Sequence, residues 1–155
     1  MGNLKPKKIN KGKIKNATAL EVGGLKFKSK LELFTYNKLI EAGIIDFKYE
    51  EKKFVLLEAF EFTNESYELK KDKSLVNASR NIRSITYLPD FTNIDDFNNG
   101  WVLECKGYPN DAFPLKWKWF KDHLVKNNYN VTLYKPNNQA NVLKTIELIK
   151  NKYYV

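Results

Sequence analysis

Three residues near the middle of the chain are of the types that can bind a metal ion and a phosphate group together: Asp90, Glu104 and Lys106. Hydrolysis of a phosphodiester needs an attacking hydroxide, neutralisation of the charge at phosphorus and a stabilised leaving oxygen. One or two Mg²⁺ ions held by carboxylates can supply all three, and a lysine can stabilise the developing negative charge. A surface ion-pair cluster is the alternative interpretation, but apolar residues precede both Asp90 and Glu104, which argues against it.

Two predicted strands position these residues. Side chains alternate along a strand, so Glu104 and Lys106 point to the same side, about 7 Å apart, whereas Cys105 points to the opposite side. Cys105 is then most simply a small buried apolar residue. Pro89 ends the pairing of the preceding strand just before Asp90. If the two strands are antiparallel neighbours, Asp90 and Glu104 are close enough to share an ion.

A fourth carboxylate, Glu32, lies in a predicted helix that runs from Ser29 or Lys30 to Ala42. Ser29 suits the N-cap, Glu32 occupies the capping-box position, and Gly43 is a natural stop. At 3.6 residues per turn, Glu32 falls inside the apolar arc of this helix. The other members of that arc are Leu33, Tyr36, Leu39 and Ile40. Two interpretations stay open: a helix cap, or a carboxylate aimed at the site of Asp90 and Glu104.

The rest of the sequence predicts a mixed α/β sheet with helices packed on it, in one domain over residues 17–155 that follows a flexible basic tail over residues 1–16. Residues 63–81 are polar and predict a long loop or an extended hairpin tip. The other predicted elements are a hairpin around Gly23-Gly24, strands within 44–62, 81–91 and 101–107, a turn at 93–100, helices at 114–127 and 138–151, and a strand at 130–135.

The helix predicted from Pro114 carries aromatic and basic residues on neighbouring faces. Trp117, Phe120 and Leu124 form its core stripe, whereas Lys116 and Trp119 share the adjacent face with His123. Trp119 could stack on an unpaired base, but a half-buried aromatic that fills the space between helix and sheet is the simpler interpretation. His123 is interpreted as a surface or interface residue and not as a general base. On the closing helix, the buried side is predicted to hold Val142, Ile146 and Ile149, with Leu143 alongside.

The net charge of +9 and the pI near 9.4 indicate an anionic partner. Residues 1–20 contain six lysines and no acid, which leaves only +3 for the rest of the chain. These tail lysines are Lys5, Lys7, Lys8, Lys11, Lys13 and Lys15. The tail is either a solubilising segment or a DNA-binding segment that follows the phosphates and makes DNA binding depend on salt.

Other chemistries are excluded by composition. One cysteine, Cys105, permits no internal disulfide and no cysteine-rich zinc site, and one histidine, His123, permits no two-histidine metal motif. Any metal must therefore be held by carboxylates, and oxygen ligands favour Mg²⁺ or Mn²⁺. No run of about 18 apolar residues predicts a membrane span, and the basic N-terminus is not followed by the apolar segment of a secretory signal. We expect a soluble protein in a reducing cytoplasm.

The residues above resemble a known signature. Pro89-Asp90 followed by Glu104-Cys105-Lys106 resembles the PD-(D/E)XK motif of restriction-endonuclease-like nucleases. With Ser-Lys-Leu-Glu opening a helix, then Ile-Thr-Tyr-Leu-Pro-Asp-Phe and Trp-Val-Leu-Glu-Cys-Lys-Gly, the chain resembles phage endonuclease I-type Holliday junction resolvases. It is still more similar to a group of small phage-encoded, nuclease-like proteins. The resemblance covers roughly residues 16–134, and the segment 63–81 matches least well.

The resemblance implies a restriction-endonuclease-like αβββαβ core, here with an N-terminal hairpin and a C-terminal helix, and Mg²⁺-dependent cleavage of DNA with Mn²⁺ as a substitute. It implies catalytic roles for Glu32, Asp90, Glu104 and Lys106. It further implies metal ligation by Asp90, Glu104 and the main-chain carbonyl of Cys105, with Glu32 as an additional candidate. Lys116 matches a lysine that lies near the substrate phosphate.

We therefore expect a metal-dependent, structure-selective endonuclease of a phage, acting on branched DNA such as Holliday junctions in the cytoplasm of the bacterial host. Two alternatives stay open: the same chemistry on flapped, nicked or linear duplex DNA, or a non-catalytic DNA-binding protein with this fold. Symmetric cleavage of a junction needs two active sites, so we expect a homodimer. The N-terminal hairpin or the first helix is the candidate interface.

Overall fold

The computed structural model describes residues 20–78, 80–108 and 110–155, and the predicted basic tail lies outside them. The chain enters through a hairpin of β1 (Leu20–Val22) and β2 (Leu25–Phe27). Gly23 and Gly24 both have positive φ, +59° and +82°, which is the conformation that a two-residue hairpin turn requires. The predicted hairpin around these two glycines is confirmed.

The centre of the fold is a four-stranded sheet in the order β12-β11-β10-β3. These strands are β3 (Lys48–Tyr49), β10 (Phe91–Ile94), β11 (Asn99–Leu103) and β12 (Asn130–Tyr134). β10 is antiparallel to both β3 and β11, and Phe91 pairs with Leu103, whereas β12 runs parallel to β11. The ends of β10 and β11 that carry Asp90 and Glu104 therefore lie side by side, as the antiparallel arrangement requires.

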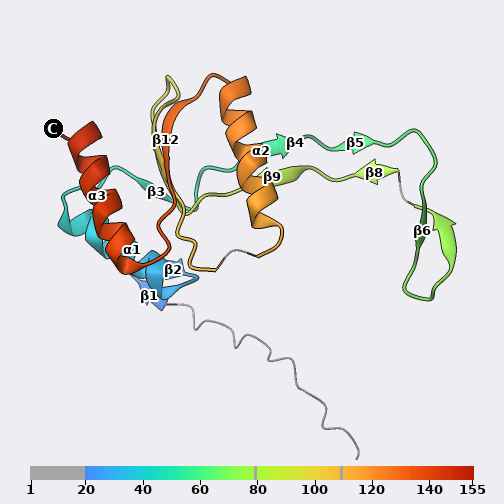
Figure 1. Cartoon of the computed structure of the whole chain (residues 1–155), viewed down its shortest axis with the longest axis horizontal. Helices are drawn as coiled ribbons and strands as arrows, with labels where there is room; N and C mark the ends of the chain where they lie inside the picture. The colour runs from blue at the N-terminus through green and yellow to red at the C-terminus, as the bar shows by residue number, and fades with distance from the viewer. Residues whose placement is uncertain (1–19, 79, 109) are drawn as a thin grey trace, which may run out of the picture.

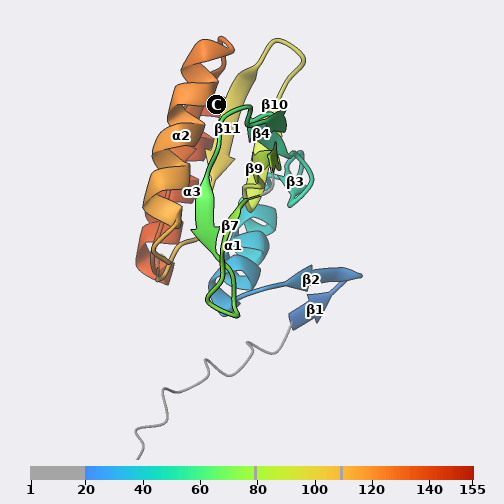
Figure 2. The ribbon, with the colours of Figure 1, turned by 90° about the vertical axis from the view of Figure 1, so that its right-hand side faces the viewer.

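Helices cover both faces of this sheet, as Figures 1 and 2 show. They are α1 (Lys30–Glu41), α2 (Phe113–Lys126) and α3 (Gln139–Tyr153). α1 and α3 pack against Trp101, Leu103 and Cys105, whereas α2 packs against Val102 on the other face. The alternation predicted for residues 101–106 is thereby confirmed, and Cys105 is a buried free cysteine.

The segment between β3 and β10 forms a long antiparallel ribbon. It consists of β4 (Phe54–Leu57) paired with β9 (Ile85–Tyr87), β5 (Phe60–Glu61) with β8 (Asn81–Ile82), and β6 (Tyr67–Leu69) with β7 (Leu75–Asn77). Phe54 and Tyr87 anchor the ribbon to the core beneath α2. Beyond them residues 58–84, called the arm below, project away from the body in Figure 1. Of the two alternatives for residues 63–81, the extended hairpin is the correct one.

Helix α1 begins and ends as predicted, but its buried face is different. Ser29 is the N-cap, and Gly43 and Ile44 donate to Ile40 O and Leu39 O, which closes the C-terminus. Glu32 is buried, as its place inside the predicted arc indicates, but Ile40 is 42% exposed and Thr35, which was not assigned to the arc, is buried. The helix lies against the sheet along a stripe that includes these two polar side chains, so its apolar arc is shifted from the one predicted.

Two smaller expectations also need correction. Strand β10 continues to Ile94, so the turn predicted at 93–100 is confined to Asp95–Asn98, where Asn98 has a φ of +62°. Leu143 is 49% exposed, and Thr145 takes its place on the buried side of α3. The mixed α/β class is confirmed. Within the described residues, none of the helices has the length and apolarity that a membrane span requires.

Candidate active site

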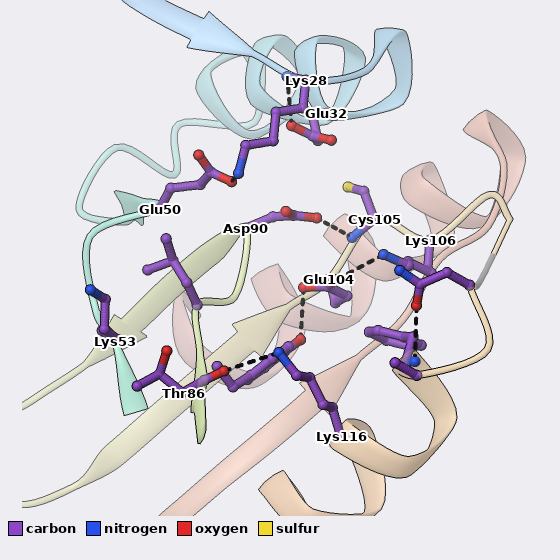
Figure 3. A pocket seen from close by; sticks show the side chains of 15 residues that line it. Lys28, Glu32, Glu50, Lys53, Thr86, Asp90, Glu104, Cys105, Lys106 and Lys116 are labelled. Atoms are coloured by element: carbon purple, nitrogen blue, oxygen red, sulfur yellow. Dashed lines mark hydrogen bonds and ion pairs between the residues drawn. The ribbon is translucent and has the colours of Figure 1, made fainter. Parts of the chain in front are cut away.

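A cleft of about 540 Å³ opens where α1, the end of β9, the end of β11 and the start of α2 meet. The predicted residues that line it are Glu32, Asp90, Glu104, Cys105, Lys106 and Lys116. They come from four separate segments of the chain, and Figure 3 shows them around one space. The fold therefore brings together the residues that the sequence singled out.

Asp90 lies at the floor of the cleft and is 8% exposed. Its Oδ2 accepts a hydrogen bond from the Cys105 N–H at 2.7 Å, which ties the start of β10 to the end of β11. Burial raises the pKa of Asp90 to about 8, and the charges of Glu104 and Glu32 add to that rise. Asp90 is thus a carboxyl group that binds a proton near neutral pH unless a cation takes the place of that proton.

Glu104 follows β11 directly and is 5% exposed. Its main-chain N–H donates to Tyr134 O at 2.9 Å, which continues the pairing with β12 and fixes the direction of the side chain. Tyr87 Oη donates to Glu104 Oε2 at 2.7 Å, and Lys106 Nζ lies 3.8 Å from Oε1. Burial raises the pKa of Glu104, while the hydrogen bond from Tyr87 and the charge of Lys106 act in the opposite direction.

Glu32 both caps α1 and faces the cleft, so the two interpretations of this residue are compatible. Its carboxylate accepts from Ser29 Oγ at 2.8 Å and from the Lys28 N–H at 3.0 Å, while its own N–H donates to Ser29 Oγ at 3.1 Å. Tyr49 Oη adds a fourth contact at 2.8 Å. Glu32 is only 6% exposed, and these hydrogen bonds satisfy its buried carboxylate.

Four lysines line the cleft and bring positive charge to its rim: Lys28, Lys53, Lys106 and Lys116. Lys106 Nζ lies 4.6 Å from the centre of the Phe113 ring, a cation–π contact that holds the amine beside Glu104. Lys116 Nζ donates to Thr86 O at 3.3 Å from the first turns of α2. Lys28 forms an ion pair with Glu50. An anionic group that enters the cleft would therefore meet ammonium groups on more than one side.

The donor set of the cleft fits a hard divalent cation. Among the described residues, no three Asp, Glu, His or Cys side chains form a ready ligand group. Asp90 and Glu104 nevertheless supply two buried oxygen donors, and each has one oxygen already fixed by a hydrogen bond. The pKa of both carboxyls is raised, so a cation between them would replace a proton and relieve their repulsion.

No family model matches this chain, and no curated protein or solved structure does either.

Several further residues of the cleft region were not singled out by sequence, among them Tyr87, Tyr49, Glu50 and Lys28. The sequence could have indicated Tyr87, since a tyrosine in a strand otherwise suited to a core needs a partner for its hydroxyl group. No sequence pattern indicates Glu50. It follows the very short β3 with a φ of +45°, and its N–H donates to Asp90 O at 2.8 Å. Only the pairing of β3 with β10 brings it here.

Other predicted residues lie elsewhere. Trp119 is half-buried and packs against the core beneath α2, as the simpler interpretation had it, and it does not line the cleft. His123 is also half-buried, with its ring 5.9 Å from that of Phe54 and away from the carboxylates. The six tail lysines lie outside the described residues, so their contact with DNA stays a prediction.

Proposed function

We propose that this chain is a Mg²⁺-dependent endonuclease that hydrolyses phosphodiester bonds in DNA. The observation that carries the proposal is the pair of Asp90 and Glu104, both buried in one cleft, with the amine of Lys106 3.8 Å from Glu104. Burying two carboxylates together is unfavourable without a cation. Such an arrangement is typical of a site where function, rather than stability, selects the residues.

Each residue of the cleft has a distinct role in this proposal. Asp90 and Glu104 would hold the cation, which supplies an activated water and neutralises charge on the phosphate. Tyr87 and the Cys105 N–H each occupy one carboxylate oxygen, so that the other oxygen is directed to the cleft. Lys106 is placed to stabilise negative charge that develops on the phosphate. Glu32, whose carboxylate accepts three hydrogen bonds, is held in one orientation beside these residues.

The order of elements supports the same proposal. One helix, α1, precedes the strands that carry Asp90 and Glu104, and α2 and β12 follow them. This is compatible with the αβββαβ core of the restriction-endonuclease-like nucleases, whose motif the sequence resembles. In that resemblance Glu32, Asp90, Glu104 and Lys106 are the catalytic residues, and all four line one cleft.

The proposed substrate is branched DNA such as a Holliday junction, and the proposed active form is a homodimer with one cleft for each strand cut. The net charge of +9 and the lysines at the cleft support an anionic polymer as the substrate. The preference for branches rests on the sequence resemblance alone. Flapped, nicked or linear DNA remains the competing substrate class for the same chemistry.

The test is cleavage of a labelled four-way junction by the purified protein in Mg²⁺, beside flapped, nicked and linear duplexes of the same sequence. We expect cleavage that is fastest on the junction, that EDTA abolishes and Mn²⁺ supports. Lys106→Met should lose at least about 100-fold in rate, whereas the matched exposed-lysine variant Lys144→Met on α3 should cut normally. Absence of cleavage on all four substrates in either metal would overturn the enzymatic proposal. If the protein binds these DNA substrates but cleaves none of them, the non-catalytic alternative is favoured.

A further inference from the structure

The arm, residues 58–84, is unsupported by the rest of the molecule. None of its described residues is buried, and its strands pair only with each other. A two-stranded ribbon alone in water is marginally stable, because it has no third strand or helix to cover its apolar side chains. In Figure 1 the ribbon runs clear of the helices and the central sheet.

The arm nevertheless carries large apolar side chains. Phe60 pairs with Ile82 across the ladder, and these are 46% and 37% exposed. Nearer the tip, Leu69 pairs with Leu75 and they are 72% and 63% exposed. Tyr67, two residues before Leu69 and hence on the same face, is 60% exposed. Apolar residues gathered in this way on a projecting element are typical of a protein interface.

The charge of the arm argues against DNA as its partner. It contains five acidic and five basic side chains, so it is neutral, while the whole chain carries +9. Neutral segments gain little from counterion release, which drives most DNA binding. The arm therefore differs from the basic rim of the cleft in both charge and apolar content, and a protein surface is the partner that it fits.

The charges are also divided along the arm in a way that favours a second copy of itself. The tip holds three lysines and one aspartate: Lys70, Lys71, Lys73 and Asp72. Glu65 lies two residues before β6, and Glu68 lies within β6, on the face opposite Tyr67 and Leu69. When two identical arms lie side by side in opposite directions, the basic tip of each meets the acidic flank of the other. Such a contact is self-complementary, as a two-fold symmetric interface requires.

We propose that the arm is the dimerisation surface of this protein, with two arms packed antiparallel so that Tyr67, Leu69 and Leu75 are covered by the partner arm. The self-association needs neither DNA nor metal. Its use, which is to present two clefts to one branched substrate, rests on the proposed function. This interface differs from the N-terminal hairpin and first helix expected from the sequence.

Sedimentation equilibrium without DNA or Mg²⁺ tests the proposal, over protein concentrations up to about 100 μM. The wild type is expected to be a dimer. The double variant Leu69→Ser/Leu75→Ser should raise the dissociation constant at least tenfold. The control Leu143→Ser/Leu148→Ser removes two leucines of α3 that are 49% and 58% exposed. This control should leave the dissociation constant of the dimer unchanged. A third variant, Ile40→Ser, tests the first helix and should also remain dimeric.

Charge reversal makes the test specific for antiparallel pairing. The tip variant replaces Lys70, Lys71 and Lys73 by Glu, and the flank variant replaces Glu65 and Glu68 by Lys. Each alone places like charges together and should be monomeric, whereas an equimolar mixture should recover the dimer. A monomeric wild type, dimers lost only with Ile40→Ser, reversed variants that stay dimeric, or a mixture that stays monomeric would each overturn the proposal. Junction cleavage, measured separately, decides the enzymatic function whatever the result here.

Discussion

The substitution Asp90→Asn should stabilise the metal-free protein, by an amount that grows with pH. The pKa of Asp90 rises from 3.8 in the unfolded chain to about 8 in the fold, chiefly through burial. Between those two values the folded protein holds a proton that the unfolded chain has lost. The stability of the wild type must therefore fall as the pH rises through this window. Asparagine does not titrate, so the stability of the variant does not fall with pH for this reason.

The magnitude follows from the size of the shift. Each pH unit inside the window contributes about 1.4 kcal/mol to the stability difference between wild type and variant. Between pH 5 and pH 7 the free energy of unfolding of the variant should increase by about 3 kcal/mol relative to that of the wild type. This difference should level off above about pH 8. Because Glu104 repels the ionised Asp90, the proton belongs to the pair, and Glu104→Gln should show the same trend.

The assay is urea unfolding in EDTA at pH 5, 6, 7 and 8, followed by circular dichroism. Asp96→Asn serves as the control because Asp96 is exposed and does not line the cleft. Mg²⁺ at pH 8 should stabilise the wild type and leave Asp90→Asn almost unaffected, since the cation takes the place of the missing proton. A difference between wild type and Asp90→Asn that stays constant from pH 5 to pH 8 would refute the reasoning.

Three other outcomes are expected. Tyr87→Phe removes the hydroxyl that donates to Glu104, so the pKa of Glu104 should rise further. Mg²⁺ binding, measured by calorimetry, should then need a higher pH. An unchanged pH profile of binding would show that the hydroxyl is not a positioning group. The Lys135 amine lies 5.7 Å from the ring centres of Phe113 and Trp117, beside the cleft. Lys135→Gln should therefore lower the slope of log K against log salt for DNA binding by about 1. The control Lys144→Gln, on α3, should leave this slope unchanged. Deletion of residues 1–15 should also flatten this salt dependence while Mg²⁺ binding stays intact, and an equal slope would count against a phosphate-binding tail.

Sequence patterns predicted most of the elements that build the cleft, because each has a strong local cause. The serine cap and the glycine stop define α1, and Pro114 starts α2 close to the observed Phe113. Alternation placed Glu104 and Lys106 on the face opposite Cys105, since apolar residues on both sides of that strand are buried. Local chemistry thus predicted the elements and the strand faces that carry these residues.

Long-range pairing could not be predicted in the same way. Glu50 reaches the cleft only because the two-residue strand β3 joins β10, and a strand so short has no periodicity to detect. The buried face of α1 was misjudged for a related reason. Thr35 is buried because its hydroxyl bonds Leu31 O and contacts the Cys105 sulfur at 3.2 Å, which hydropathy does not report.

The same hydrogen bonds that keep the cleft ordered also explain why its acids have remained open for a ligand. Each carboxylate is held by neutral donors: Asp90 by a main-chain N–H, Glu104 by Tyr87, and Glu32 by Ser29 and Tyr49. Neutral donors fix the direction of a carboxylate without cancelling its charge, whereas an ion pair to lysine would do both. Lys106 forms an ion pair with Glu104 at 3.8 Å, which is longer than the 2.7 Å hydrogen bond from Tyr87, and its amine also lies against the Phe113 ring. A cleft built in this way directs carboxyl oxygens into its floor and places ammonium groups at its rim, which suits a cation and a phosphate bound together.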